Sequence, residues 1–197
     1  MVSVFDNKKV ILASGSPRRI EMLRNDGVDF EIIKPMCSED IHMKLSAHDE
    51  VMALALRKGL SSLEKCDCIK DNLIVLACDT LVVCDGKAIG KPKDETDAFE
   101  ILKSLNNRSH QVMSGVCIIE FKDGKRTIKL FCESTDVFFK EYTDEEIREY
   151  IKTKEPMDKA GAYAIQGIFS KYIDHIEGSY NNVVGFPYER IKEYLKN

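Results

Sequence analysis

Two long runs of β-type residues, 111–121 and 127–139, flank the dipeptide Asp123-Gly124 in this 197-residue chain. An Asp-Gly pair between such runs is a strong hairpin signal, because both residues tolerate the positive φ angles of a tight turn. Strands joined by a tight turn run antiparallel. The chain must therefore fold around a sheet that contains at least one long antiparallel hairpin.

Shorter apolar runs predict further strands. The candidates are residues 9–13, 30–33, 73–77 and 81–84. Continuous apolar runs are typical of buried strands. A second Asp-Gly pair, Asp85-Gly86, predicts a hairpin turn after the last of them.

Capping residues and apolar stripes predict helices between these strands. Ser16 is a natural N-cap before Pro17, and Thr143 with Glu146 forms a capping box. The predicted helices run from Pro17 to Gly27, Ser46 to Ser61, Asp94 to Leu105, Thr143 to about Lys154 and Tyr188 to Leu195, with a loop over 155–170. This order predicts one α/β domain over residues 1–197, with a mixed central sheet and flanking helices.

Composition excludes several functional classes. Lys and Arg number 29 against 33 Asp and Glu, and this net charge of −4 argues against nonspecific nucleic-acid binding. No apolar run reaches the roughly 20 residues that span a bilayer, and the first residues do not resemble a signal peptide. Seven cysteines, an odd number, favour reduced thiols in the cytoplasm.

The cysteines and histidines offer no metal site. Cys66 and Cys68 have no partner pair at zinc spacing. Strand-like runs hold Cys78, Cys84, Cys117 and Cys132, which are interpreted as buried thiols. His110, just before a strand, is interpreted as structural.

Residues 14–19, Ser-Gly-Ser-Pro-Arg-Arg, form the first candidate binding segment. Backbone N–H groups at a helix start favour anions, and Ser14 lies at this turn. The helix dipole disfavours Arg18 and Arg19 in the first turn unless they face a phosphate. The alternative interpretation is a solvated helix start with two surface arginines.

Four further residues carry weaker signals. Asp79, followed by Thr80, interrupts two apolar runs, so its carboxylate could hold a metal or accept a proton, or simply form a turn. Lys91 after Gly90 could meet a phosphate, as could Lys58, although a single lysine usually faces solvent. Gln166 lies in a Gly- and Ala-rich loop; its amide could contact the edge of a base, or the loop could be purely structural.

Four segments together resemble the Maf family of nucleotide pyrophosphatases. They occur in family order and span nearly the whole chain. They are residues 12–19 (LASGSPRR), 78–80 (CDT) with 90–92 (GKP), 110–116 (HQVMSGV), and 155–167 (EPMDKAGAYAIQG) with 183–187 (VVGFP). The resemblance implies a fold related to inosine triphosphate pyrophosphatases, with a curved mixed sheet and two lobes around a nucleotide cleft. It also implies hydrolysis of a nucleoside triphosphate to the monophosphate and pyrophosphate.

The resemblance further implies roles for individual residues. Asp79 matches the proposed proton acceptor, and Glu39 and Lys91 match catalytic positions; for Glu39, the neighbouring Asp40 is a rival. The positions that match the phosphate pocket are Ser14, Arg18, Arg19 and Lys58. A divalent cation, Mg²⁺ or Mn²⁺, is expected on Glu39 and Asp79, and which carboxylate is base and which is ligand stays open.

Arg18, Thr80 and Gln166 resemble the branch that acts on dTTP and UTP. The family also implies a homodimer. Two alternatives remain: a pyrophosphatase for noncanonical purine nucleotides such as ITP or XTP, and a non-catalytic regulator of cell division or septum formation.

Overall fold

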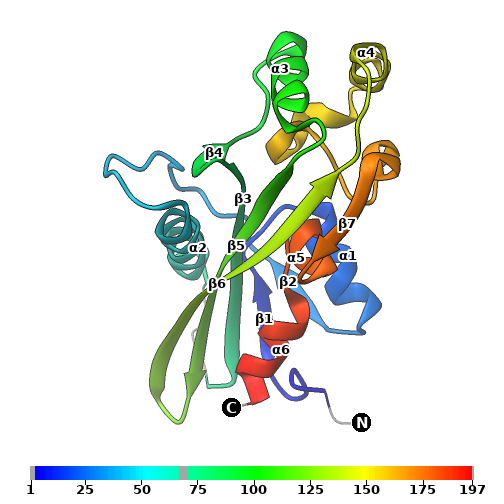
Figure 1. The fold of residues 1–197 in the computed structure, drawn as a ribbon. Coiled ribbons are helices and arrows are strands. Elements are labelled where there is room, and N and C mark those ends of the chain that lie inside the picture. The colour runs from blue at the N-terminus through cyan, green and yellow to red at the C-terminus, as the bar shows by residue number, and fades with distance from the viewer. Residues whose placement is uncertain (1–2, 67–70, 197) are drawn as a thin grey trace. The chain divides into compact units, whose positions relative to one another are not determined.

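The protein is a mixed α/β structure, as the sequence predicts, in a computed structural model that describes residues 3–66 and 71–196 (Figure 1). Seven strands form one sheet in the order β2-β1-β3-β5-β6-β7, with β4 paired to β3. The strands are β1 (Lys9–Leu12), β2 (Phe30–Ile32), β3 (Leu73–Cys84), β4 (Lys87–Ile89), β5 (Ser109–Lys122), β6 (Lys125–Phe139) and β7 (Ile173–Glu177). β1 is parallel to β2 and β3, whereas the β3–β4 and β6–β7 pairs are antiparallel.

The predicted helices are confirmed with small shifts in their bounds. The α-helices are α1 (Pro17–Asn25), α2 (Ala47–Leu63), α3 (Glu95–Leu105), α4 (Asp144–Lys152), α5 (Tyr180–Val184) and α6 (Tyr188–Lys196). The capping box at Thr143 and Glu146 is present at the start of α4. No helix among the described residues is long and apolar enough to cross a membrane.

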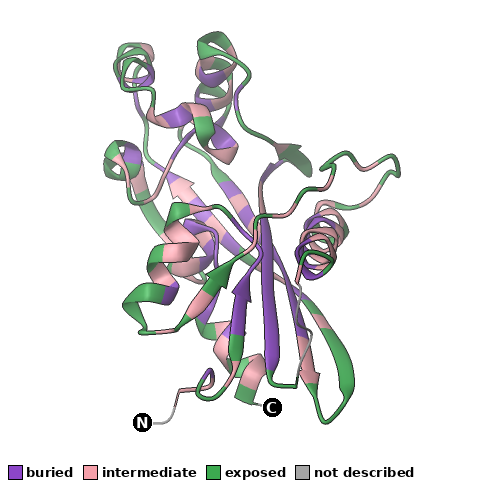
Figure 2. Ribbon diagram, turned by 180° about the vertical axis from the view of Figure 1, so that it is seen from behind, coloured by how far each residue is buried: buried purple, intermediate pink, exposed green. Residues whose placement is uncertain are grey.

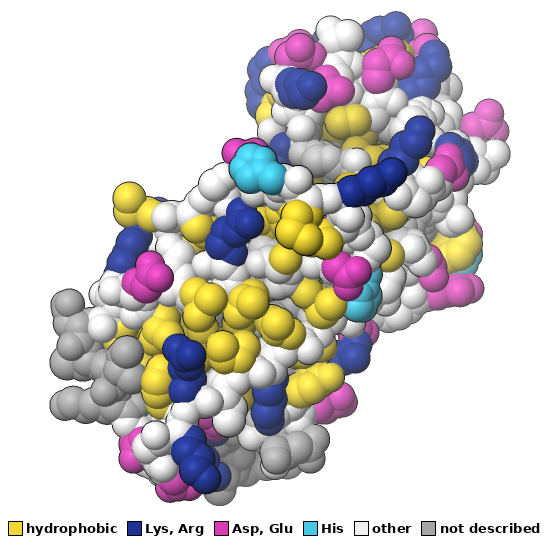
Figure 3. Space-filling view, turned by 90° about the vertical axis from the view of Figure 1, so that its left-hand side faces the viewer, with side chains coloured by type: hydrophobic (Ala, Val, Ile, Leu, Met, Phe, Trp, Pro, Cys, Tyr) yellow, Lys and Arg dark blue, Asp and Glu magenta, His cyan; other side chains and the backbone are white. Residues whose placement is uncertain are grey.

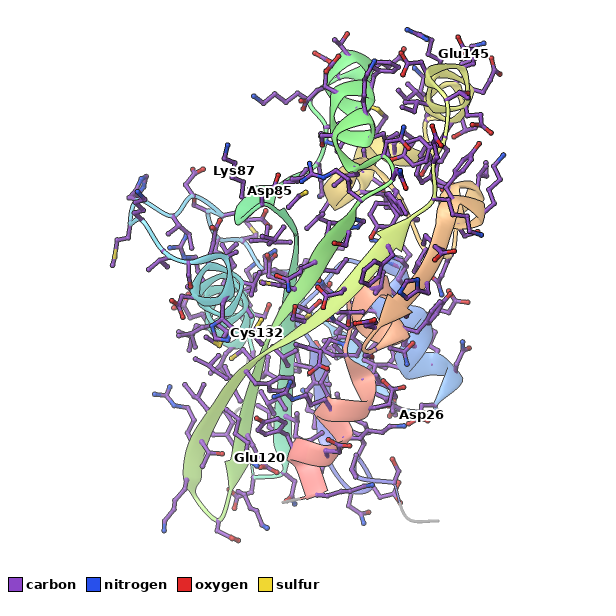
Figure 4. All side chains as sticks on the ribbon, viewed as in Figure 1. Asp26, Asp85, Lys87, Glu120, Cys132 and Glu145 are labelled. Atoms are coloured by element: carbon purple, nitrogen blue, oxygen red, sulfur yellow. The ribbon has the colours of Figure 1, made fainter. Side chains whose placement is uncertain are left out.

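The two Asp-Gly pairs form the predicted tight turns. All four residues have positive φ angles, 50° and 72° at Asp85-Gly86 and 52° and 70° at Asp123-Gly124. Asp85 lies within the first turn and Lys87 directly follows it (Figure 4). The Asp85 carboxylate accepts two hydrogen bonds of 2.7 Å from Arg108.

The chain divides into two compact units. Unit 1 comprises residues 1–79, 114–133 and 185–197, and unit 2 comprises residues 80–113 and 134–184. The strands β3, β5 and β6 each contribute residues to both units. The expectation of one domain and of a cleft between two lobes stays a prediction.

Unit 1 buries the two faces of its strands in two separate clusters (Figure 2). Val10, Leu12, Ile74 and Leu76 share one cluster with residues of α1 and α6. The alternate residues of the same strands, Ile11 and Val75 among them, share the other cluster with residues of α2. This alternation explains why β1 and the first half of β3 are apolar without interruption.

Unit 2 has a core rich in aromatic rings. Residues of α3 and α4 contribute to it, as do the rings of Phe139, Tyr142, Tyr163, Phe169 and Tyr172. Edge-to-face contacts join many of these rings, with centroids 4.8 Å apart for Phe139 and Tyr163 and 5.0 Å apart for Tyr142 and Phe169.

Four sequence predictions need correction. β3 is one continuous strand, so Asp79 lies inside a strand and not at a break between two. Its carboxylate is tolerated there because it pairs with Lys58. Ser16 is the N-cap of α1 but makes no side-chain cap bond.

The predicted loop over 155–170 contains three short 3-10 helices, η1 (Glu155–Asp158), η2 (Ala160–Ala162) and η3 (Ile168–Tyr172). Cys132 is half-buried, not buried.

The sequence analysis does not predict the strand β7, which carries no long apolar run, or the helix α5, which is only five residues long. The signal for α5 is Ser179, whose hydroxyl accepts a hydrogen bond from the Asn182 N–H at 3.2 Å. The six described cysteines are free thiols, as predicted, and Cys68 lies outside the described residues.

Candidate active site

A three-residue ion cluster in unit 1 joins β3, α2 and the loop that follows β2. Lys58 Nζ lies 2.5 Å from Asp79 Oδ1 and 2.6 Å from Glu39 Oε1. The side chains of Lys58 and Asp79 are only 13% and 11% exposed, whereas that of Glu39 is 66% exposed. The cluster therefore has a buried ion pair at its base and an accessible carboxylate at its mouth.

The alternation of β3 explains how Asp79 meets Lys58. Val75 and Ala77 pack against α2, and Asp79, two residues further along, lies on the same face of the strand. On α2, Ala55 packs in that same cluster, and Lys58 follows it by three residues on one helix face. Sheet and helix periodicity thus bring a carboxylate and an ammonium together at the edge of the apolar core.

The electrostatics of Lys58 favour its charged form. Burial alone would lower the pKa of Lys58, but the charges and hydrogen bonds of Asp79 and Glu39 outweigh burial and raise this pKa above its usual value. Lys58 is thus a permanent cation between two carboxylates.

Arg57 holds the loop that carries Glu39. Its Nη1 atom donates hydrogen bonds to the carbonyl oxygens of Ser38 and Asp40, at 2.7 and 2.9 Å, on either side of Glu39. The carboxylate of Asp40 accepts a hydrogen bond from the Ser38 hydroxyl at 3.0 Å. Glu39, not its rival Asp40, contacts Lys58.

The donor set at this cluster fits a hard divalent cation. Glu39 and Asp79 supply carboxylate oxygens, and the positive charge between them is the Lys58 ammonium. Mg²⁺ is usually held by one or two carboxylates together with substrate phosphates. No group of three or more His, Cys, Asp or Glu side chains that could hold a metal occurs within residues 3–66 and 71–196. A cation here would thus rely on the two carboxylates and on oxygen atoms from a ligand.

Arg19 makes structural contacts at the start of α1. Its guanidinium donates to the carbonyl oxygens of Cys78 and Gly185, at 2.6 and 2.8 Å, and to the Ser14 hydroxyl at 3.3 Å. Ser14 is buried, and its hydroxyl also accepts from the Ser16 N–H at 3.1 Å. These bonds tie the turn after β1 to the residue before Asp79. Arg18, one position earlier on α1, is half-buried.

The remaining predicted residues, Thr80, Lys91 and Gln166, belong to unit 2. Thr80 is half-buried on β3, and Lys91 and Gln166 are exposed. The Gly161 N–H donates to the Gly90 carbonyl at 3.0 Å, which joins the segment of Lys91 to the segment that leads to Gln166. Ser14, Arg18, Arg19, Glu39, Lys58 and Asp79 all belong to unit 1.

Sequence reasoning missed Arg57 and the carbonyls of Cys78 and Gly185. A surface arginine on a helix gives no local sign that it will hold a loop 17 residues away. Backbone carbonyls carry no sequence signal, because every residue has one.

Comparisons with known proteins agree over nearly the whole chain. A family model described as Maf-like protein matches residues 9–197. A curated dTTP/UTP pyrophosphatase of Caldicellulosiruptor bescii is 45% identical over 190 residues, which cover 96% of this chain and 94% of that protein. One of Clostridium botulinum (strain Eklund 17B / Type B) is 46% identical over 189 residues, which cover 95% of this chain and 98% of that protein.

Among solved structures, the Ham1 protein of Staphylococcus aureus aligns with 96% of this chain and 98% of its own, with a TM-score of 0.51. The two sequences are 14% identical, so this likeness concerns the fold.

Proposed function

This chain belongs to the Maf family, and from this premise we propose that it hydrolyses dTTP and UTP to the nucleoside monophosphate and pyrophosphate. Curated relatives named dTTP/UTP pyrophosphatase match it at 45% and 46% identity over nearly their whole length. The observation that carries the chemistry is the Glu39–Lys58–Asp79 cluster, in which two carboxylates lie within hydrogen-bond distance of the Lys58 ammonium.

In the proposed reaction, a water oxygen bonds to the α-phosphorus and the bond from that phosphorus to the bridging oxygen breaks. The water proton goes to a carboxylate, and pyrophosphate leaves. We assign the proton to Asp79, which has the more buried carboxylate of the pair. Lys58 balances its negative charge and provides positive charge toward the triphosphate, a role that Arg18 and Arg19 share. The neutral hydroxyl of Ser14 would contribute a hydrogen bond to the same phosphates.

We propose that Glu39 and Asp79 hold a divalent cation, Mg²⁺ or Mn²⁺. When bound, such an ion supplies positive charge against the developing charge on the phosphate oxygens. The two hard oxygen donors support this assignment.

We assign recognition of the base to Thr80 and Gln166 and a phosphate contact to Lys91. The family resemblance supports these roles. The backbone bond between Gly90 and Gly161 adds support, since it fixes the Lys91 segment against the chain that leads to Gln166.

The test is a panel of dTTP, UTP, CTP, ITP and 7-methyl-GTP with detection of pyrophosphate. We expect dTTP and UTP to give the highest kcat/KM, a chelator to abolish turnover, and added Mg²⁺ or Mn²⁺ to restore it. If ITP ranks first, the protein is a purine-type pyrophosphatase; if no triphosphate is cleaved, it is a non-catalytic regulator. Activity that survives chelation would remove the metal from the mechanism.

We also propose a cytoplasmic homodimer. Hydrophobic side chains gather on the surface shown in Figure 3. The exposed large hydrophobic residues of unit 1 include Met36, Met43, Ile128 and Leu130. Exposed apolar side chains of this kind favour a partner surface. Sedimentation of the purified protein should give about twice the monomer mass of 22.4 kDa.

A further inference from the structure

Gln166 lies at the tip of a short turn in unit 2 that has little regular structure of its own. The Gly167 N–H donates to the Ala164 carbonyl at 3.1 Å and closes the turn, and Gln166 is exposed. A side chain that selects a base must be held in a fixed orientation by its surroundings. The question is which residue fixes this turn.

The carboxylate of Glu155 holds the end of this turn. Both of its oxygens accept from the Ile168 N–H, at 3.1 and 3.2 Å, and Oε1 also accepts from the Tyr150 hydroxyl at 2.9 Å. Tyr150 is itself fixed, because it is only 3% exposed and its ring lies 4.7 Å from that of Phe169. The carboxylate therefore connects the turn to the rigid core beneath it.

Gly167 makes this close approach possible. A Cβ atom at position 167 would overlap Glu155 Oε1 and Cδ, so no larger residue fits while Glu155 keeps its place. The backbone of Glu155 is also anchored, since its N–H donates to the Thr153 hydroxyl at 3.2 Å. Glu155 and Gly167 thus fit together as a pair directly beside Gln166.

We propose that Glu155 is a positioning residue for Gln166 and thereby sets selectivity for the pyrimidine base, without taking part in the phosphoryl step. This inference rests on the proposed function, in which Gln166 contacts the base. The hydrogen-bond partners of Glu155 named above lie in unit 2, whereas the ion cluster lies in unit 1.

The test is a double-mutant cycle of Glu155→Ala and Gln166→Ala, with the kcat/KM of dTTP divided by that of ITP as the readout. Each single variant should lower this ratio about tenfold, the worth of one hydrogen bond, through KM for dTTP rather than kcat. Because Glu155 acts through Gln166, the double variant should lose no more selectivity than Gln166→Ala alone. Additive losses, or an unchanged ratio in Glu155→Ala, would overturn the inference.

Two further variants keep the test decisive if Glu155→Ala fails to fold. Glu155→Gln keeps an oxygen that can accept from the Ile168 N–H, so its ratio should stay within about threefold of wild type. Gly167→Ala should lower the ratio as Glu155→Ala does, since the added methyl group would displace the Glu155 carboxylate from the Ile168 N–H. A Gly167→Ala protein that folds with wild-type selectivity would count against the inference.

The matched control is Glu146→Ala. Glu146 completes the capping box of α4 in the same unit and makes hydrogen bonds of similar number, so its loss should lower the melting temperature and leave the selectivity ratio unchanged. If the wild-type protein cleaves neither dTTP nor UTP, the proposed function fails and this inference with it. If it cleaves them and the ratio is insensitive to Glu155, this inference alone fails.

Discussion

The buried ion pair of unit 1 contrasts with the neutral hydrogen-bonded pairs at the centre of unit 2. In unit 1, Asp79 and Lys58 are both charged and nearly buried, and they pair at 2.5 Å. In unit 2, the buried polar groups pair as neutral partners: His110 Nε2 lies 2.7 Å from the Tyr163 hydroxyl, and the Asn182 amide donates to Thr135 Oγ1 at 3.0 Å.

This difference separates a chemical role from a structural one. Burying charges costs far more than burying neutral hydrogen-bonded groups, so a buried ion pair is poor evidence of stabilisation. A charged pair that opens toward an exposed third member, Glu39, is suited to bind an ion or move a proton. The neutral pairs of unit 2 connect polar groups inside its aromatic core without burying a charge.

The largest expected effect comes from Asp79→Asn, which removes the proposed proton acceptor of unit 1. We expect kcat to fall by about 10²–10⁴, the usual contribution of a general base, and to fall for dTTP and ITP alike. Steady-state kinetics with pyrophosphate detection measures it. The matched control is Asp85→Asn, in the hairpin turn that follows β3, and it should retain wild-type turnover. A value for Asp79→Asn within threefold of wild type would reject its role.

The second prediction tests whether the buried His110–Tyr163 pair of unit 2 is uncharged. Burial lowers the pKa of His110 from 6.5 to about 4, so between these pH values the unfolded chain binds a proton that the folded protein does not. Stability should therefore fall as pH falls, by about 3 kcal/mol between pH 7 and pH 4 from this residue alone.

Urea unfolding at several pH values measures this loss. In His110→Gln, which keeps a neutral partner for Tyr163, the decrease toward pH 4 should be about 3 kcal/mol smaller than in wild type. His42→Gln, at an exposed position, should leave the decrease unchanged. If the stability of His110→Gln falls toward pH 4 as much as that of wild type, the buried His110–Tyr163 pair does not cause the loss of stability in acid.

The smallest effect is expected at Arg57, which lies beside the ion cluster without joining it. Arg57→Ala frees the loop over residues 38–40, so Glu39 should be held less firmly and kcat should fall about tenfold. The Mg²⁺ concentration for half-maximal activity should rise as well. Arg126→Ala, in the exposed first residues of β6, is a control for loss of one positive charge. If Arg57→Ala and Arg126→Ala lower kcat by the same factor, Arg57 acts only through its charge.

The local structure of this protein was largely determined by its sequence. Asp85-Gly86 and Asp123-Gly124 form tight turns and Thr143 with Glu146 forms a capping box, because these signals act between neighbouring residues. The apolar runs of β1 and β3 mark strands that are covered on both faces. The family motifs identified the candidate residues, but not their contacts.

Only the tertiary structure decided those contacts. Asp79 meets Lys58 because strand and helix periodicities coincide across 21 residues, and Arg19 reaches the Gly185 carbonyl across 166 residues. The Glu155 carboxylate accepts from the backbone N–H of Ile168, a group that every residue except proline carries. Such pairings depend on how elements pack, and a pattern within one segment contains no information about the partner that packing brings to it.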